Sequence, residues 1–225
     1  MYYGVQGLPE IEGWLSDRQG QRLFEAAAAT SGRGAIVEIG SWKGRSTAWL
    51  AAGAMRAGRR VYAIDPHRGS REDPMADTLS VFLDNMRRAG VSQAVEPLVM
   101  TSADAAAAWR DPVELLFIDG DHSDDAVMRD AELWLPRLVE RGWVMFHDVA
   151  TSGYTGPRRV FRQRICWSAD FDSVAHVGSM GVARRTNRRS ARAAVWGTAM
   201  GLLLYFYDLQ WTLRRLRKRG SSAAR

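Results

Sequence analysis

Acidic residues and a histidine close several short apolar runs of this sequence. Asp65, Asp119 and the pair His147-Asp148 each stand at the end of such a run. If the runs are parallel strands, their carboxyl ends share one edge of a sheet, where open α/β sheets bind ligands. Two carboxylates with an imidazole suit a divalent ion such as Mg²⁺ or Mn²⁺. We therefore expect a metal site at Asp119, His147 and Asp148.

Such a site would activate a hydroxyl group. An alcohol is a weak nucleophile until it loses its proton, and metal coordination makes that loss easier and orients the oxygen. His122, three residues after Asp119, is placed to take the proton as general base. Two alternatives stay open. His147 and Asp148 could instead form a metal-free acid/base pair or have a structural role only, and His122 could cap the helix that follows it.

A second candidate site lies earlier in the chain. Gly40 and Gly44 frame a loop after the apolar run 35–39, and glycines allow a tight turn and a close approach to a ligand. Their spacing matches neither the dinucleotide pyrophosphate fingerprint nor the Walker phosphate loop. Asp65 is placed to hold a ribose diol. The pattern predicts a nucleoside ligand without pyrophosphate, the alternative being a purely structural tight turn.

Helical and extended patterns alternate at the spacing of β-α-β units, which indicates an α/β fold with helices on both faces of a mostly parallel sheet. The expected strands are residues 35–39, 60–65, 95–100, 113–119, 142–148, 171–177 and 181–184. The expected helices are residues 16–32, 46–55, 75–88, a short one capped by Ser102, 124–138 and 157–165. Ser16 and Gln19 form a capping box at the first helix. The last two strands are too close for a parallel crossover, so they must form an antiparallel hairpin.

The glycine loop, VEIGSWKGRST at residues 37–47, resembles motif I of class I S-adenosylmethionine-dependent methyltransferases, in the small-molecule and sugar O-methyltransferase branch. The stretches AIDP at residues 63–66, FIDGDHS at 117–123 and FHD at 146–148 are also similar to motifs of that branch. The resemblance covers roughly residues 8–185. It implies a Rossmann-like methyltransferase fold, with a mostly parallel seven-stranded sheet and a terminal antiparallel hairpin.

The resemblance also implies residue roles. Glu38 and the backbone of residues 40–44 would face the methionine part of S-adenosylmethionine, and Asp65 would hold the ribose hydroxyls. The residues after the third strand would lie near the adenine. The expected cofactor-binding residues are Glu38, Gly40, Ser41, Gly44, Ser46, Asp65, Ser102, Ala103 and Asp104. The expected catalytic residues are Asp119, His122 and Asp148, and the expected metal ligands are Asp119, His147 and Asp148.

The formal charge of +6 is the sum of the charges of two unlike parts of this 225-residue chain. Residues 1–183 carry −4, whereas residues 184–225 hold eleven basic residues and one acid, Asp208, for a net +10. We expect a methyltransferase domain at residues 1–185 and a helical tail at residues 186–225. Since the body is mildly acidic, the basic pI is weak evidence for nucleic-acid binding. The single cysteine, Cys166, excludes a disulfide framework and a cysteine-built zinc site.

The tail contains an apolar run at residues 193–207 with arginines on both sides. This run is shorter than the ~20 residues that span a bilayer. An apolar helix with basic ends is typical of peripheral membrane contact. Heptad spacing favours the alternatives of packing on the body or across a homodimer; the heptad positions are Val195, Ala199, Leu202, Phe206, Leu209, Leu213 and Leu216. Aromatic and basic residues interleave too poorly for nucleic-acid binding.

These patterns together predict an O-methyltransferase whose acceptor is a hydroxyl of a sugar, a glycolipid or another secondary metabolite. We expect a cytoplasmic protein with peripheral contact to the inner membrane face, since residues 1–13 carry two acids and no apolar core that would make a signal peptide. The alternative is a non-catalytic nucleoside-binding or membrane-adaptor module that kept the fold. The intact set Asp119, His122 and Asp148 argues against it.

Overall fold

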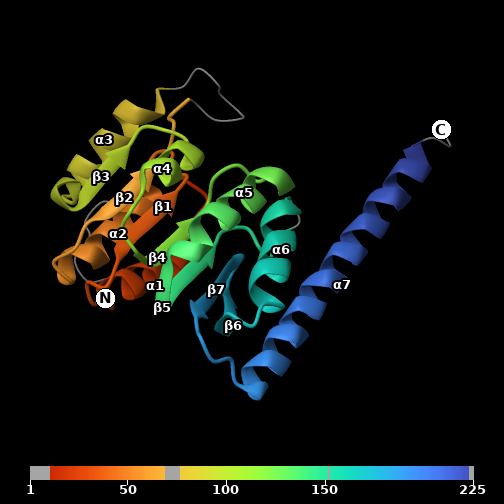
Figure 1. Cartoon of the computed structure of the whole chain (residues 1–225). Helices are drawn as coiled ribbons and strands as arrows, with labels where there is room; N and C mark the ends of the chain where they lie inside the picture. Colours follow the sequence, from red (N-terminus) through yellow and green to blue (C-terminus); the bar gives the residue numbers. More distant parts are fainter. Residues whose placement is uncertain (1–10, 69–76, 152, 223–225) are drawn as a thin grey trace.

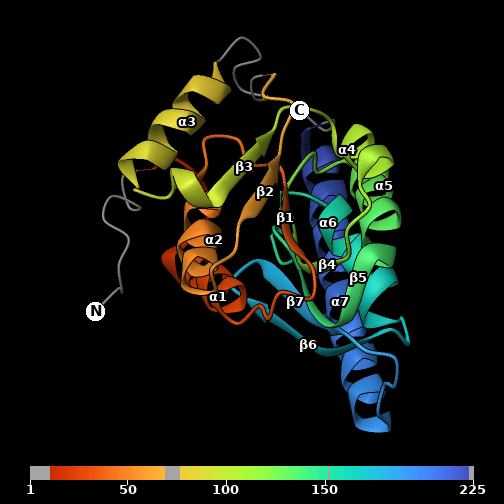
Figure 2. The same ribbon diagram turned by 60° about the vertical axis from the view of Figure 1, so that its left-hand side comes forward.

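The computed structural model describes residues 11–68, 77–151 and 153–222. Its centre is a seven-stranded sheet in the order β3-β2-β1-β4-β5-β7-β6, with helices on both faces (Figures 1 and 2). The strands are β1 Ala35–Ile39, β2 Val61–Ile64, β3 Val95–Leu98, β4 Val113–Ile118, β5 Leu138–Phe146, β6 Phe171–Val177 and β7 Met180–Arg185. The helices are α1 Asp17–Ala28, α2 Arg45–Arg56, α3 Thr78–Arg88, α4 Ser102–Ala108, α5 Asp124–Trp134, α6 Gly156–Phe161 and α7 Ala191–Ser222.

The expected topology is confirmed. Strands β1 to β5 pair in parallel, and β7 lies antiparallel between β5 and β6. Gly178, with φ +58°, makes the tight turn of the terminal hairpin. Strands β1 and β4 are buried along their whole length, because helices cover both faces of a parallel sheet. This double cover explains why both strands are apolar except at Glu38 and Glu114.

The capping box at Ser16 and Gln19 is confirmed, but the expected cap at Ser102 is wrong. Thr101 is the N-cap of α4, with extended backbone and a side chain that accepts a hydrogen bond from the amide of Asp104. A cap must lie just outside the helix so that its oxygen reaches the third helical amide. Ser102 is already inside the helix, and its hydroxyl donates to Asp130 instead.

Helix α5 ends at Trp134, earlier than the expected residue 138. Residues Leu135–Arg137 form a 3₁₀ turn that contains Pro136, since proline lacks the amide hydrogen that would continue the α-helix. Strand β5 consequently begins at Leu138. The expected helix at residues 157–165 is α6 followed by a π-helical turn, η4, at Arg162–Cys166.

Helix α7 crosses β6 and η4, and its last turns extend away from the sheet (Figure 1). Two glycines allow this close contact, because an added Cβ at Gly197 would lie 2.7 Å from the carbonyl oxygen of Cys166 and one at Gly201 would lie 2.3 Å from the indole nitrogen of Trp167. Met200 and Leu204 of α7 are buried with the main core. None of the described helices is long and apolar enough to cross a membrane.

Candidate active site

The register of the sheet places four strand ends in one row. Ile39 of β1 pairs with Ile64 of β2 and with Ile118 of β4. Ile118 in turn pairs with Phe146 of β5. The residues that follow these strands are Gly40, Asp65, Asp119 and His147. The convergence expected at the carboxyl edge is therefore present in the fold.

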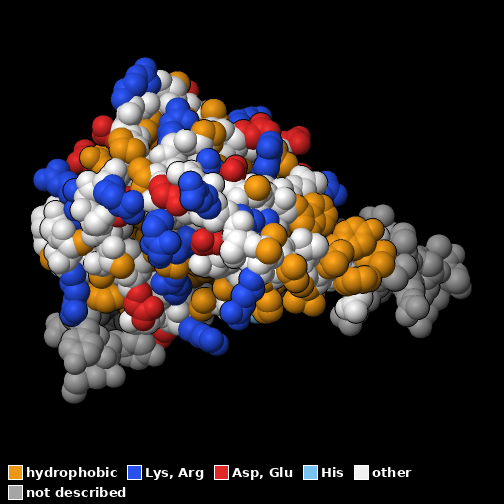
Figure 3. All heavy atoms as spheres, turned by 60° about the horizontal axis from the view of Figure 1, so that its bottom comes forward, with side chains coloured by type: hydrophobic (Ala, Val, Ile, Leu, Met, Phe, Trp, Pro, Cys, Tyr) orange, Lys and Arg blue, Asp and Glu red, His pale blue; other side chains and the backbone are white. Residues whose placement is uncertain are grey.

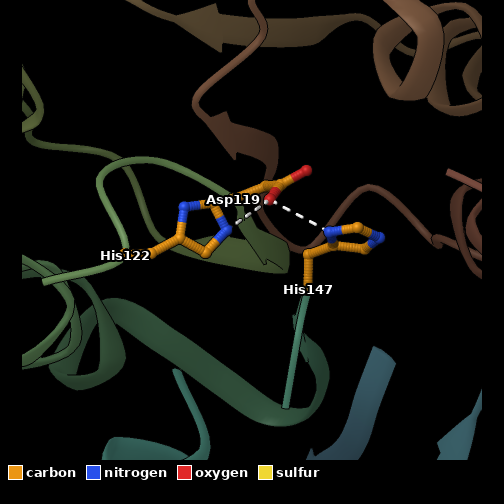
Figure 4. A group of neighbouring side chains, drawn as sticks. All are labelled: Asp119, His122 and His147. Carbon is orange, nitrogen blue, oxygen red and sulfur yellow. Dashed lines mark ion pairs between the residues drawn. The ribbon is translucent and has the colours of Figure 1, made fainter. Parts of the chain in front are cut away.

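Two histidines and two aspartates meet at this edge, and Figure 4 shows three of them. Nδ1 of His147 lies 3.2 Å from Oδ1 of Asp119. Nε2 of His122 lies 3.6 Å from the same oxygen and 3.2 Å from Oδ2 of Asp148. Asp148 adopts a left-handed backbone, with φ +54°, a strained conformation that is concentrated at functional sites. The three expected catalytic residues, Asp119, His122 and Asp148, thus lie together.

The charges of this cluster are coupled. Burial opposes protonation of His147, but Asp119 and Asp148 outweigh it and raise the pKa of His147 to about 10. Burial raises the pKa of Asp119 above its ordinary value, against the attraction of both histidines. Burial also acts against ionisation of Asp148, yet hydrogen bonds from His122 and His147 hold its pKa well below the ordinary range. The two carboxylates therefore favour the protonated form of His147.

The same cluster fits a divalent metal ion. Asp119, His122 and His147 each offer one ligand atom, and these atoms lie within 4.8 Å of one another. The expected ligand set contained Asp148 in place of His122, so the structure adds a second imidazole to the candidate ligands. Imidazole is a better ligand for Mn²⁺ and the later transition metals than for Mg²⁺. A small hollow beside the cluster is lined by the candidate ligands and by Phe146 and Pro157.

The glycine loop lies next to this cluster. Gly40 and Gly44 have φ of +86° and +89°, and Trp42 between them has φ +43°. The carboxylate of Asp65 accepts hydrogen bonds from the backbone amides of Trp42 at 2.8 Å and His67 at 2.7 Å. Asp65 therefore fixes the loop between β1 and α2 against the loop after β2. Its remaining lone pairs are the ones that a ribose diol would use.

Glu38 is fully buried beneath this loop. Its carboxylate accepts hydrogen bonds of 2.5 Å from Ser46 and from Thr47, in the first turn of α2. Burial raises the pKa of Glu38 to about 8, although both hydroxyls oppose the shift. The structure thus places Glu38 and Ser46 as partners of each other. Ser41, by contrast, has a buried hydroxyl without a partner among the described residues, which suits a ligand contact.

Two of the three residues after β3 that we expected to contact the adenine form hydrogen bonds within the protein. Ser102 donates to Asp130 of α5, and its neighbour Ala103 is half-buried. Asp104 is exposed and accepts a 2.6 Å hydrogen bond from Thr101. Their cofactor roles stay predictions.

Sequence reasoning missed two residues near the candidate site. Asp130 is buried, and burial raises its pKa to about 6. Its helical spacing from Val127 and Trp134 could have predicted that it lies on the buried face of α5. Tyr154 stacks on His122, with ring centroids 4.2 Å apart and an interplanar angle of 26°. No local pattern marks this tyrosine, because the contact joins two different loops.

Comparison with known proteins identifies a family. A family model described as a methyltransferase domain matches residues 37–149. The catechol O-methyltransferase of Mycobacterium tuberculosis is 33% identical over 147 residues, which are 65% of this chain and 60% of that protein. The present chain therefore spans less than two thirds of that relative.

Solved structures share the fold. The O-methyltransferase from Bacillus cereus, in complex with SAH, superposes with a TM-score of 0.61 at 22% identity, over 79% of this chain and 86% of that one. The O-methyltransferase TomG from Streptomyces achromogenes, in complex with SAM, gives a TM-score of 0.59 at 22% identity, over 80% of this chain and 83% of that one. At these identities the likeness shows the fold alone.

Proposed function

The chain belongs to the methyltransferase domain family, and from this premise we propose that it is a class I S-adenosylmethionine-dependent O-methyltransferase that methylates a hydroxyl group of a small molecule. The observation that carries the proposal is the convergence of Asp119, His122 and Asp148 beside the glycine loop. A cofactor loop and an acid/base cluster on one sheet edge can bring a methyl donor and a hydroxyl acceptor together. Positioning of two reactants is itself a large part of catalysis.

The cofactor fits the residues of the loop. The left-handed backbone at Gly40 and Gly44 gives the loop its tight turn, and the unpartnered hydroxyl of Ser41 can bind a ligand. Asp65 would hold the ribose hydroxyls with the lone pairs that its loop contacts leave free. S-adenosylmethionine supplies a methyl group on a sulfonium, which a nucleophilic oxygen can attack in line.

His122 serves as the general base in this proposal. Its Nε2 faces both Asp119 and Asp148, so the imidazolium that forms when it takes the acceptor proton is stabilised by two carboxylates. The ring of Tyr154 packs against the imidazole and limits its rotation. Asp119 and Asp148 thus stabilise the positive charge of the imidazolium, and His122 accepts the proton.

A divalent metal ion would be held by Asp119, His122 and His147, with Asp148 as the alternative ligand that the sequence indicates. Such an ion lowers the pKa of an acceptor hydroxyl. Because two imidazoles are present, we propose Mn²⁺ ahead of Mg²⁺. With His122 as a ligand of that ion, water rather than this imidazole would accept the acceptor proton.

The acceptor that we propose is a hydroxyl of a sugar, a glycolipid or a secondary metabolite. Support for these classes comes from the resemblance of the motifs, and the relative named as a catechol O-methyltransferase supports a hydroxyl acceptor in general. The cytoplasmic location and the domain boundary at residue 185 also stay predictions.

The test compares Asp119→Asn with Asp84→Asn, which removes the charge of an aspartate on α3 whose side chain is 45% exposed. Cofactor binding is measured by isothermal titration, and methyl transfer by mass spectrometry of acceptor pools incubated with methyl-labelled cofactor. We expect both variants to bind the cofactor and Asp119→Asn alone to lose turnover. Turnover that survives in Asp119→Asn would refute the role of the cluster. Cofactor binding by the unmodified protein without transfer to any acceptor would favour the non-catalytic module.

The metal is tested separately on the unmodified protein. We expect a chelator to abolish turnover, and added Mn²⁺ to restore it better than Mg²⁺. Full activity in the presence of chelator would leave the metal-free acid/base pair as the mechanism.

A further inference from the structure

The inner and outer faces of α7 differ sharply. The inner face packs on the body through Gly197, Met200, Gly201 and Leu204, which are all buried. Asp208 lies on the same side and binds Arg158 and Arg162. The helix is therefore docked in a fixed rotation, and this rotation decides which residues face the solvent.

The first five heptad positions of the tail face outward. We call them the outer stripe: Val195, Ala199, Leu202, Phe206 and Leu209, all exposed. Phe206 is 57% exposed and Leu202 is 48% exposed. Further large exposed side chains flank the outer stripe on both sides, namely Trp196, Leu203, Tyr205 and Tyr207. Figure 3 shows apolar side chains gathered where the helix leaves the body.

This apolar surface is bracketed by positive charge. Arg188 and Arg192 are exposed at its beginning. In the sequence, five basic residues stand between positions 214 and 219 after it. The one acid of residues 184–225 is Asp208, and its carboxylate is engaged by the body. The outward side of the tail therefore offers an uncharged centre that follows exposed arginines and precedes a basic stretch of the sequence.

This pattern disfavours a second copy of the chain as the occupant. A coiled coil between two α7 helices needs complementary charges beside its seam, whereas here both ends are basic. In a parallel pair each basic end would lie beside the same basic end of the other helix. In an antiparallel pair the two different basic ends would lie side by side, so both arrangements bring like charges together. The exposed apolar surface is also broader than a two-helix seam, since the large side chains flank the outer stripe on both sides.

We propose that the outer stripe of α7 docks the protein on an anionic lipid surface. The apolar side chains enter the boundary between headgroups and acyl chains, and the arginines at both ends meet lipid phosphates. The helix lies along the surface, in agreement with the absence of a membrane-spanning helix among the described residues. This docking is independent of the proposed methyl transfer.

The test is vesicle flotation of the full chain. Vesicles contain phosphatidylcholine with phosphatidylglycerol, or phosphatidylcholine alone. The variant Leu202→Glu/Phe206→Glu changes two exposed residues of the outer stripe. Its matched control is Val81→Glu/Leu83→Glu, which places the same charges on exposed apolar positions of α3. Circular dichroism and cofactor titration verify that both variants are folded.

We expect the unmodified protein and the α3 control to float with anionic vesicles, less so as NaCl is raised. The outer-stripe variant should lose about tenfold or more of its bound fraction. Equal flotation of the two variants, no flotation of the unmodified protein, or equal binding to phosphatidylcholine alone would overturn the proposal. A dimer in sedimentation that Leu202→Glu/Phe206→Glu dissociates, without vesicle binding, would overturn it in favour of self-association.

Discussion

Replacing Asp208 by alanine tests how α7 is attached to the catalytic body. Oδ1 of Asp208 accepts a 2.5 Å hydrogen bond from Nε of Arg158, and Oδ2 accepts one of 2.6 Å from Nη1 of Arg162. The side chain of Arg158 is fully buried and that of Arg162 is 8% exposed. The guanidinium of Arg158 also lies 4.9 Å from the ring centre of Tyr207. Two buried cations therefore share one carboxylate.

Asp208→Ala leaves both guanidinium groups buried without their carboxylate. Removal of one partner of a buried ion pair costs about 3–5 kcal/mol. Because the side chain of Asp208 is 22% exposed, water already screens the cluster in part. We therefore expect the lower end, a loss of about 3 kcal/mol in the free energy of docking or unfolding.

The assay is urea unfolding at neutral pH, followed by tryptophan fluorescence and circular dichroism, with hydrogen exchange of the α7 amides. The matched control is Asp170→Ala, which removes the acidic partner of Arg185, 3.6 Å away, at a site where Asp170 is 57% exposed. Surface pairs contribute about 0–1 kcal/mol, so this control should change little.

Hydrogen exchange separates two ways in which Asp208→Ala can show its effect. If α7 undocks alone, its amides exchange faster while the sheet keeps its protection. If the whole fold is weakened, the urea midpoint falls as well. Should Asp208→Ala match Asp170→Ala in both measurements, the ion cluster does not anchor α7.

Three further predictions concern the candidate site. Burial raises the pKa of Glu38 to about 8 from an ordinary 4.5; the folded state then retains a proton that the unfolded state loses, so stability should fall by about 2 kcal/mol between pH 6 and pH 8. Urea unfolding should show this fall in the unmodified protein and a flatter profile in Glu38→Gln. Gly40→Ala would place a Cβ 2.2 Å from a carbonyl oxygen of the neighbouring strand end and should abolish cofactor binding in titration, whereas Gly58→Ala, also left-handed but with open space, should keep it. Tyr154→Ala should lower kcat by about tenfold with cofactor affinity unchanged, because it frees the imidazole of His122 to rotate. Tyr154→Phe keeps the aromatic ring and should restore the rate. Equal rates in all three proteins would contradict this positioning role.

Much of the fold follows from local patterns in the sequence. The mostly apolar run at residues 35–39 is β1 to the residue, because a strand covered on both faces favours apolar side chains. The short spacing of the last two strands forces the hairpin, since a parallel crossover would not fit. Local detail was less predictable at Ser102 and at the end of α5, where a one-residue shift or one proline decides the outcome.

The sequence predicted some of the residues that meet at the candidate site but not all of them. Parallel strands end at one edge, so Asp65, Asp119 and His147 had to lie near one another once the strands were recognised. The tertiary structure added His122 to the candidate ligands, because its position depends on the path of the loop after β4. It also placed Tyr154 on His122.

The same distinction between sequence and tertiary structure applies to the tail. The sequence by itself determined its net charge of +10, its apolar centre and the heptad spacing of its residues. Only the tertiary structure decided which side of the helix is free. The two glycines at positions 197 and 201 and the ion pairs of Asp208 fix the rotation of α7 on the body, and contacts between residues so distant in sequence leave no periodic signal in either segment alone.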